Sequence, residues 1–401
     1  LAILGMGYVG LPLAVAFSKF YKTKCFDTNK ERIKELKNKI DSNYLVKQKE
    51  FNNNLFFCDD LLKIKDCNIY IVCVPTPVSK NNKPDLKPLI NSINDISKII
   101  EKKNIIIVES TVYPGVTRKL VTEIFLKNKK FTLNKDYYLG YSPERINPGD
   151  KKNSLNNISK IVSTSSIVCK NTICNLYKKI CKKIEYVEKI EVAEAAKVIE
   201  NVQRDINIAL MNELWSLFKM HTDLDFNAIL KAAASKWNFI NFKPGMVGGH
   251  CIPVDPYYLA EYAKKNKFNT KFILQSRKIN NLFYKEIINY INNKYGHSLS
   301  KFKCLILGLS YKSNVADVRN SQSVKFIKNI SKYTKKIDYY DPYVQNISIK
   351  TNNQCTINQV KSINTRKKYD LIIQLVNHDF FKKNKKILIS KLKHKNNLFK
   401  L

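Results

Sequence analysis

The sequence predicts an α/β protein in which two doubly wound parallel sheets are joined by a helical central domain. Three observations support this prediction. Short apolar segments alternate with amphipathic ones in the first part of the chain, a helical pattern fills the middle, and the alternation resumes after Ser298. Alternation of this kind is typical of parallel sheets covered by helices. We therefore expect domains at 1–190, 191–297 and 298–401.

The first domain begins directly on a strand. Short apolar runs that end at glycine or polar residues predict strands at 1–4, 24–26, 69–74 and 105–109. An amphipathic helix is expected at residues 11–20, between the first two of these strands. The order strand, helix, strand indicates parallel pairing.

The middle of the chain has a helical pattern from residue 192 to about residue 293. Between 192 and 221, apolar residues recur three and four positions apart, which is the spacing of a long amphipathic helix. This connecting helix is too apolar to stand alone in water. We therefore expect it to form the core of a homodimer or a larger homo-oligomer.

The last part of the chain returns to the α/β pattern. Apolar runs predict strands at 303–307, 336–340 and 370–376, and a helix is expected near 321–333. The chain starts without a methionine and ends in a segment rich in Lys and Asn. These two features suggest that one or both termini are trimmed.

Composition limits the classes of function. No apolar run approaches the roughly 18 residues that span a bilayer, and residues 1–10 resemble a strand and turn more than a signal peptide. The ten cysteines form no CxxC pair and show no metal-ligand spacing. We therefore expect a cytoplasmic protein with no membrane partner and no metal.

The formal net charge of +37 raises the question of nucleic-acid binding. Lys, Asn and Ile are abundant throughout, as a strongly AT-biased coding sequence would produce, and the lysines form no stripe with interleaved aromatic residues. We therefore expect no nucleic-acid partner. The charge should instead attract small anions such as nucleotide diphosphates.

A cofactor site is predicted at the first turn of the chain. The run Gly5-Met6-Gly7-Tyr8-Val9-Gly10 lies between a strand and a helix, which is the context of the Rossmann dinucleotide fingerprint. Asp27 follows about 20 residues on, where a carboxylate binds the adenosine ribose hydroxyls and disfavours a 2′-phosphate. This predicts NAD. Arg32 lies close by and leaves a 2′-phosphate open as an alternative.

Two further strand ends carry polar residues, at Val74-Pro75-Thr76-Pro77 and Glu109-Ser110-Thr111-Val112. The carboxyl ends of strands line the ligand crevice in a doubly wound sheet. We therefore expect Thr76 and Thr111 to flank the nicotinamide. Capping of the strand end is the alternative role for these hydroxyls.

Cys251 is the candidate nucleophile. It lies in Gly248-Gly249-His250-Cys251-Ile252-Pro253-Val254-Asp255, among glycines and polar residues, whereas the other cysteines occur in apolar stretches. Asp255 can face the same pocket if Pro256 begins a helix. His250 could lower the thiol pKa, but adjacent side chains commonly point apart. A protease-like Cys/His pair is the other use of such residues, and a dinucleotide domain has no place in that chemistry.

Two more segments carry candidate residues. Lys197 and Asn201 are four apart on the long helix, with Arg204 one turn further, and could hold an oxyanion or could simply form a solvated face. The segment 141–150 follows a strand and is too rich in proline and charge to be core. Its Glu144 is a candidate base.

Six motifs in order give the chain a family resemblance. They are GMGYVG, ESTVYPG, SPERINPGD, AEAAKVIENVQRDINIALMNE, KPGMVGGHCIPVDPYYL and GLSYKSNVADVRNS. Together they resemble the UDP-glucose/GDP-mannose dehydrogenase family over nearly the whole chain. The resemblance implies oxidation of a sugar C6 alcohol to a carboxylate in two steps, with two molecules of NAD and no release of aldehyde.

The resemblance also implies roles for individual residues. Cys251 would form a thiohemiacetal and then a thioester. Lys197 and Asn201 would stabilise oxyanions, Asp255 and Thr111 would position water, and Glu144 would be the base for thioester hydrolysis. The substrate contacts would also include Arg145, Arg204, Gly248, Tyr311 and Lys312, and Arg319 would reach NAD.

One departure bears on the substrate. Glucose-type members have a second carboxylate four residues beyond the position of Glu144, where this chain has Pro148. The segments SPERINPGD, NVQRDINIALMNELW and KWNF resemble the members that act on UDP-N-acetylglucosamine or UDP-N-acetylgalactosamine in surface-polysaccharide synthesis, such as capsule or lipopolysaccharide. The 4-epimer stays open. UDP-glucose and UDP-N-acetylmannosamine are alternative substrates.

Two other classes of protein compete with this reading. A two-electron hydroxyacid or 6-phosphogluconate-type dehydrogenase has a similar N-terminal organisation, but the second α/β part argues against it. A catalytically inactive nucleotide-binding protein is the non-enzyme alternative. The joint presence of Cys251, Lys197, Asn201, Glu144 and Asp255 argues against such decay.

Overall fold

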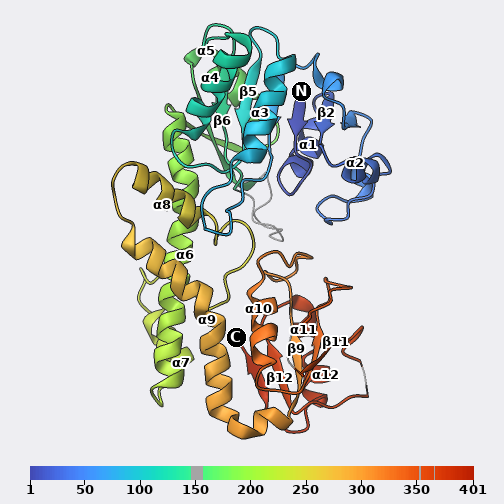
Figure 1. Ribbon diagram of the computed structural model, residues 1–401, viewed down its shortest axis with the longest axis vertical. Helices are drawn as coiled ribbons and strands as arrows, with labels where there is room; N and C mark the ends of the chain where they lie inside the picture. The colour runs from blue at the N-terminus through green and yellow to red at the C-terminus, as the bar shows by residue number, and fades with distance from the viewer. Residues whose placement is uncertain (146–156, 352–353, 365) are drawn as a thin grey trace. The chain divides into compact units, whose positions relative to one another are not determined.

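The computed structural model describes residues 1–145, 157–351, 354–364 and 366–401. These residues form two compact units, each made of two separate stretches of the chain (Figure 1). Unit 1 comprises Leu1–Glu200 and Tyr257–Asn269, and unit 2 comprises Asn201–Pro256 and Thr270–Leu401. Each unit is described by itself.

Unit 1 is built on an eight-stranded sheet in the order β3-β2-β1-β4-β5-β6-β7-β8. Its strands are β1 (Ala2–Leu4), β2 (Thr23–Phe26), β3 (Leu55–Cys58), β4 (Ile69–Val72), β5 (Ile105–Val108), β6 (Tyr138–Tyr141), β7 (Ser159–Thr164) and β8 (Lys183–Val187). The first six are parallel, and β7 pairs antiparallel to β6. The order of these six strands is that of a dinucleotide-binding sheet.

Helices cover this sheet, so its central strands are apolar on both faces. They are α1 (Gly10–Ser18), α2 (Lys30–Lys37), α3 (Lys87–Ile99), α4 (Val116–Lys129), α5 (Ile167–Lys178) and parts of α6 (Ile190–Met220) and α8 (Asp255–Lys265), with short 3-10 turns at Gln48–Glu50 and Leu61–Ile64. All four residues of β5 are buried. Such continuous burial is typical of a parallel sheet with helices on both sides. The four strands predicted for this part of the chain are confirmed.

Unit 2 contains a second parallel sheet, in the order β11-β10-β9-β12-β13. Its strands are β9 (Lys303–Leu307), β10 (Lys336–Tyr340), β11 (Thr356–Gln359), β12 (Leu371–Gln374) and β13 (Leu398–Lys400), and its helices include α7 (Phe226–Ala233), α9 (Lys271–Tyr295), α10 (Gln322–Ile330), α11 (Asp379–Lys383) and α12 (Lys385–Ser390), with a 3-10 turn at Gly296–Lys301. This is the strand order of the first five strands of unit 1. The predicted second doubly wound sheet is therefore confirmed.

The sheet of unit 2 packs against α9 and the second half of α6. Trp215 of α6 contacts Phe283 of α9 edge to face, with 5.3 Å between ring centroids, and also contacts Phe399 of β13.

The middle of the chain is less helical than its pattern predicts. Residues 234–254 form a long irregular loop, because Pro244, Gly245 and two further glycines interrupt the helical pattern.

Among the described residues, no helix is both long and apolar enough to cross a membrane. The same residues contain no cluster of three or more His, Cys, Asp and Glu side chains that could hold a metal ion.

Candidate active site

The glycine-rich turn between β1 and α1 has a geometry that suits a pyrophosphate. Gly5 has a φ of +94°, and a Cβ there would lie 2.9 Å from the carbonyl oxygen of Cys73. A Cβ on Gly10 would lie 1.9 Å from the carbonyl oxygen of Gly5. Both positions therefore require glycine. Gly7, Tyr8 and Val9 lie between them, and the turn leads into α1, whose first turn has no acidic side chain. Main-chain N–H groups and the helix dipole can thus receive negative charge here.

Asp27 and Arg32 lie beside this turn and have different partners. The Asp27 carboxylate accepts hydrogen bonds from the main-chain N–H groups of Met6 (2.7 Å) and Asn29 (2.8 Å). Since a carboxylate has about four acceptor positions, it can also bind ribose hydroxyls. The buried Arg32 guanidinium pairs with Asp41 at 2.7 Å and donates to the carbonyl oxygen of Met6 at 3.0 Å. These contacts favour a role for Arg32 in holding the turn, so the arrangement fits NAD.

The two strand-end loops expected at the nicotinamide are hydrogen-bonded to each other. The Thr76 hydroxyl donates to the carbonyl oxygen of Thr111 at 2.7 Å, and the Ser110 hydroxyl donates to that of Val74 at 2.7 Å. The Tyr258 hydroxyl from α8 donates to the carbonyl oxygen of Thr76 at 3.0 Å. Thr76 and Thr111 therefore lie together at the carboxyl ends of β4 and β5.

A fully buried ion pair, which no local sequence pattern predicts, lies behind Glu144. The Lys160 ammonium of β7 lies 2.6 Å from the Glu109 carboxylate and also donates to the carbonyl oxygens of Pro143 (3.0 Å) and Ser142 (3.4 Å). The Tyr177 hydroxyl donates to the other Glu109 oxygen. Lys160 thus fixes the main chain immediately before Glu144.

The charge state of Lys160 follows from its neighbours. Burial alone would lower the pKa of Lys160, but the carboxylates of Glu109 and Glu144 raise it above its ordinary value. The ammonium is therefore charged, and Glu144 lies within its electrostatic influence.

The first half of α6 contributes further polar residues to unit 1. Arg145 pairs with Glu200 at 2.7 Å and donates to the carbonyl oxygen of Ser159 at 2.7 Å. The buried Glu194 accepts the main-chain N–H groups of Gly115 (2.5 Å) and Thr117 (2.8 Å) at the start of α4. Burial raises the pKa of Glu194 to about 7. The rest of the segment after Arg145, including Pro148, lies outside the described residues.

Lys197 and Asn201 share a face of α6, as their spacing predicts. Both are more than nine-tenths buried, whereas Arg204 is exposed. The Asn201 amide donates to the Asp255 carboxylate at 2.6 Å. The carbonyl oxygen of Cys251 accepts the main-chain N–H of Asp255 at 3.0 Å, and α8 begins at Asp255. Unit 2 therefore brings Asn201, Asp255 and the backbone of Cys251 together.

Cys251 differs in exposure from the other cysteines. Of the ten cysteines, eight are buried, Cys355 is partly exposed and Cys251 is exposed. Burial raises the thiol pKa of the buried residues, as at Cys73 and Cys304. Those thiols are therefore poor nucleophiles, which leaves Cys251 as the most accessible candidate.

A ladder of buried amides holds the loop that carries Cys251. The side-chain amide of Asn212 both donates to the carbonyl oxygen (3.1 Å) and accepts the N–H (2.8 Å) of Gly245. Asn280 of α9 accepts from Asn212 at 2.8 Å and donates to Asp205 at 2.7 Å, and Asp205 pairs with the buried Arg277. None of these residues was predicted from the sequence, because each link joins separate helices or a helix and a loop.

The Cys251 loop packs against the loop that follows β9. Gly249 has a φ of +87°, and a Cβ there would lie 2.7 Å from the Tyr311 ring. A Cβ on Gly248 would lie 2.9 Å from the carbonyl oxygen of Asn320. His250 lies 3.9 Å from Asp317 and contacts the Tyr311 ring edge to face. The paired glycines therefore allow close contact between two segments that both carry candidate site residues.

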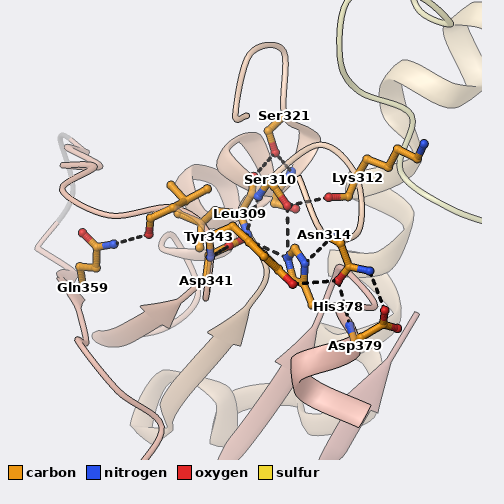
Figure 2. A network of polar contacts seen from close by, with 12 residues as sticks. Leu309, Ser310, Lys312, Asn314, Ser321, Asp341, Tyr343, Gln359, His378 and Asp379 are labelled. Atoms are coloured by element: carbon orange, nitrogen blue, oxygen red, sulfur yellow. Dashed lines mark hydrogen bonds and ion pairs between the residues drawn. The ribbon is translucent and has the colours of Figure 1, made fainter. Parts of the chain in front are cut away.

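Tyr311, Lys312 and Arg319 lie in this second loop, between β9 and α10. Gly308 starts the loop with a φ of +91°, and a Cβ there would lie 2.5 Å from Val376. Figure 2 shows the hydrogen bonds that fix its first residues, with the Lys312 side chain extending away from them. The Arg319 guanidinium pairs with Asp317 at 2.7 Å. The loop occupies the position in the second sheet that the fingerprint turn occupies in the first.

Comparison with known proteins agrees with this geometry. Residues 1–181, 191–282 and 305–399 match the NAD binding, central and UDP binding domains of the UDP-glucose/GDP-mannose dehydrogenase family. The chain is 43% identical to a UDP-N-acetyl-D-glucosamine 6-dehydrogenase of Salmonella typhi, over 95% of this chain and 90% of that one. It is 41% identical to a protein of the same name from Pseudomonas aeruginosa, over 86% and 82%.

A solved structure supports the same assignment. The UDP-D-ManNAc dehydrogenase of Pyrococcus horikoshii superposes with a TM-score of 0.84 at 28% identity, covering 98% of this chain and 94% of that one. The fingerprint turn, the two doubly wound sheets and the domain matches lead to one conclusion. The chain belongs to the UDP-glucose/GDP-mannose dehydrogenase family and is an NAD-dependent UDP-sugar dehydrogenase.

Proposed function

We propose that this dehydrogenase oxidises C6 of UDP-N-acetylglucosamine to the uronic acid in two steps, through a covalent intermediate on Cys251. The observation that carries the mechanism is the exposed Cys251 and its hydrogen-bonded neighbours. The carbonyl oxygen of Cys251 accepts the main-chain N–H of Asp255, and the Asp255 carboxylate accepts a hydrogen bond from the Asn201 amide. The substrate follows from the likeness to UDP-N-acetyl-D-glucosamine 6-dehydrogenases. UDP-N-acetylgalactosamine, its 4-epimer, is the second candidate that the sequence motifs support.

The first oxidation converts the alcohol into an aldehyde. NAD, when bound at the fingerprint turn, accepts the hydride in each oxidation. The hydroxyl proton passes to a water held by Asp255 and Thr111, while Lys197 and Asn201 stabilise the developing alkoxide. The Cys251 thiolate then adds to the aldehyde carbon, and the carbonyl oxygen takes up a proton to give a thiohemiacetal.

The second oxidation produces an acyl-enzyme. The thiohemiacetal carbon loses its hydride and its hydroxyl loses its proton, which leaves a thioester on Cys251. Glu144 takes a proton from water as the water oxygen attacks the thioester carbon, and the carbon–sulfur bond breaks to release the carboxylate. Each sugar therefore yields two hydrides and consumes one water, and the thiolate is regenerated.

The remaining site residues are assigned to binding. We propose that Gly5, Gly7, Tyr8, Val9, Gly10, Asp27, Thr76, Thr111 and Arg319 contact NAD, with Arg32 supporting the turn. Tyr311, Lys312, Gly248, Arg204 and Arg145 are proposed to contact the UDP-sugar. The close packing of Gly249 on Tyr311 supports a shared role for their two loops.

We also propose a homodimer that forms through the middle of the chain. Leu210 and Leu217 lie seven residues apart on one face of α6 and are about half exposed, and Trp237 is 92% exposed. Apolar residues repeated at this spacing on a surface helix are typical of a helix–helix interface.

We propose a cytoplasmic location, because a thiolate mechanism needs a reducing compartment. There the enzyme would supply nucleotide sugar for surface-polysaccharide synthesis.

A substrate panel tests the proposed specificity. Purified enzyme with NAD should give the highest kcat/KM with UDP-N-acetylglucosamine or UDP-N-acetylgalactosamine, and at least tenfold lower values with UDP-glucose and UDP-N-acetylmannosamine. Preference for either of the last two would contradict the assignment of the N-acetylhexosamine. NAD and UDP-sugar binding without any NADH formation would instead indicate an inactive protein.

Substitution of the nucleophile tests the mechanism. Cys251→Ser should abolish steady-state formation of the uronic acid, because an ester or hemiacetal at serine forms and breaks too slowly. The matched control is Cys355→Ser, which changes the other accessible cysteine and should retain full activity. Full activity in Cys251→Ser would remove the thiol from the mechanism.

A further inference from the structure

The imidazole of His378 is buried among the ends of three adjacent strands, directly behind the start of the Tyr311 loop (Figure 2). Strands β10, β9 and β12 are neighbours in the sheet and are followed by Asp341, by the loop from Gly308 to Ser321, and by His378. The ring also contacts the Tyr343 and Phe381 rings, with centroids 5.1 and 5.3 Å away. His378 is thus shielded from solvent on several sides.

Both ring nitrogens of His378 have partners. Nδ1 accepts the main-chain N–H of Asn314 at 2.8 Å. Nε2 lies 3.1 Å from the Asp341 carboxylate and 3.2 Å from the Ser310 hydroxyl oxygen. The Ser310 hydroxyl donates its own proton to the carbonyl oxygen of Lys312 at 2.8 Å. It therefore offers a lone pair to the ring.

These partners fix the protonation state of the ring. A main-chain N–H can only donate, so Nδ1 must carry a lone pair when it meets Asn314. The single proton of the neutral ring is then on Nε2, where Asp341 and Ser310 accept it. A second proton on Nδ1 would face the Asn314 N–H, donor against donor, at 2.8 Å. Protonation of His378 therefore breaks one anchor of the loop.

The loop that this anchor holds carries Tyr311 and Lys312. Its beginning is held by Asp341, which accepts the main-chain N–H groups of Leu309 (2.7 Å) and Ser310 (3.0 Å). A second attachment lies at Asn314, whose main-chain N–H donates to Nδ1 of His378 and whose side-chain amide donates to Asp379 (2.8 Å). Tyr311 and Lys312 lie between these two attachments, so their positions depend on both.

The charged groups around the ring decide which state is favoured. Asp341 attracts an imidazolium, but three main-chain N–H groups, including that of Tyr343 at 2.8 Å, already compensate its charge. Asp379 on α11 is exposed and pairs with Lys382 at 2.8 Å. The Asn314 N–H that donates to Nδ1 leaves no place for a second proton there, so the neutral ring is the state that fits the folded loop.

We infer that His378 is a positioning residue for nucleotide-sugar binding, which holds the Tyr311 loop through its acceptor contact with Asn314. The inference rests on the proposed function, because it requires that Tyr311 and Lys312 contact the UDP-sugar. Loss of the contact between His378 and Asn314 should therefore weaken binding of the UDP-sugar.

Calorimetric titration of the full-length enzyme tests this. We expect His378→Phe to bind UDP-N-acetylglucosamine about tenfold more weakly than wild type, the value of one lost hydrogen bond. His378→Asn, whose side-chain oxygen can replace Nδ1 as acceptor for Asn314, should bind within about threefold of wild type. The control His297→Gln, an exposed histidine outside the network, should behave as wild type.

Wild-type affinity in His378→Phe, or an equally large loss of affinity in His378→Asn, would overturn the inference. Amide hydrogen exchange provides a second readout that needs no ligand. The Asn314 N–H should be protected in wild type and in His378→Asn but exchange about tenfold faster in His378→Phe. Equal protection in all three proteins would also overturn the inference. If UDP-N-acetylglucosamine does not bind the wild type at all, the proposed substrate fails, while the exchange experiment still decides the role of His378.

Discussion

Replacement of Lys160 by methionine should affect the stability and the activity of the enzyme by separable amounts. The substitution leaves the Glu109 carboxylate buried without its cation and leaves two carbonyl oxygens without a donor. Loss of one member of a buried ion pair costs about 3–5 kcal/mol. In a folded unit of about 200 residues, 1 kcal/mol corresponds to about 2–4 °C in Tm. We therefore expect Tm to fall by roughly 6–20 °C.

The double variant Glu109→Gln/Lys160→Met separates the two effects. It removes both buried charges, so most of the lost stability should return. The carbonyl oxygens of Ser142 and Pro143 still lack their donor, which leaves a deficit of about 1–3 kcal/mol. Because Pro143 directly precedes Glu144, kcat should remain at least tenfold below wild type. The matched control Lys183→Met removes an exposed lysine from neighbouring β8 and should change neither quantity.

Two assays check this reasoning, namely thermal unfolding without ligands and steady-state NADH formation. If the double variant recovers wild-type kcat together with its Tm, the ion pair contributes stability alone and the positioning argument for Glu144 is refuted. If Lys160→Met leaves Tm unchanged, the pair is not buried as described.

Three further predictions concern other parts of the two units. Glu194, whose pKa burial raises from 4.5 to about 7, contributes stability that is complete below pH 4.5 and is lost as the pH rises through 7. The free energy of unfolding should therefore fall by about 3 kcal/mol over that interval, and Glu194→Gln should flatten the dependence in denaturant titrations. Asn212→Ala should lower kcat at least tenfold with little change in the KM for NAD, because it removes the hydrogen bonds that hold Gly245 and the Cys251 loop. An unchanged kcat would show that the loop needs no such anchor. Gly249→Ala should raise the KM for the UDP-sugar about tenfold, because the new Cβ strains a residue with left-handed backbone and displaces the Tyr311 ring. An unaltered KM would argue against contact of Tyr311 with the substrate.

The sequence predicts the parts of the site that depend on local pattern. The fingerprint turn is a strand, a glycine run and a helix in direct succession, and Asp27 directly follows the next strand, so spacing alone locates them. Lys197 and Asn201 are neighbours on a helix for the same reason. The irregular loop at 234–254 was expected to be mainly helical, although Pro244, Gly245, Gly248 and Gly249 are signals that could have identified it.

Contacts between distant segments could not be predicted. Lys160 lies 51 residues from Glu109, on a strand whose antiparallel insertion beside β6 has no local signature. A lysine in a strand is ordinarily expected to face solvent. His378 similarly meets Asn314 from 64 residues away, and only the order of strands in the sheet brings them together.

Counting NADH against a limiting amount of UDP-N-acetylglucosamine tests the central claim most directly. With excess NAD, the enzyme should form two NADH for each sugar consumed, and mass spectrometry should identify the uronic acid as the product without free aldehyde. One NADH per sugar, with an aldehyde or a ketone as product, would contradict the two-step oxidation through Cys251.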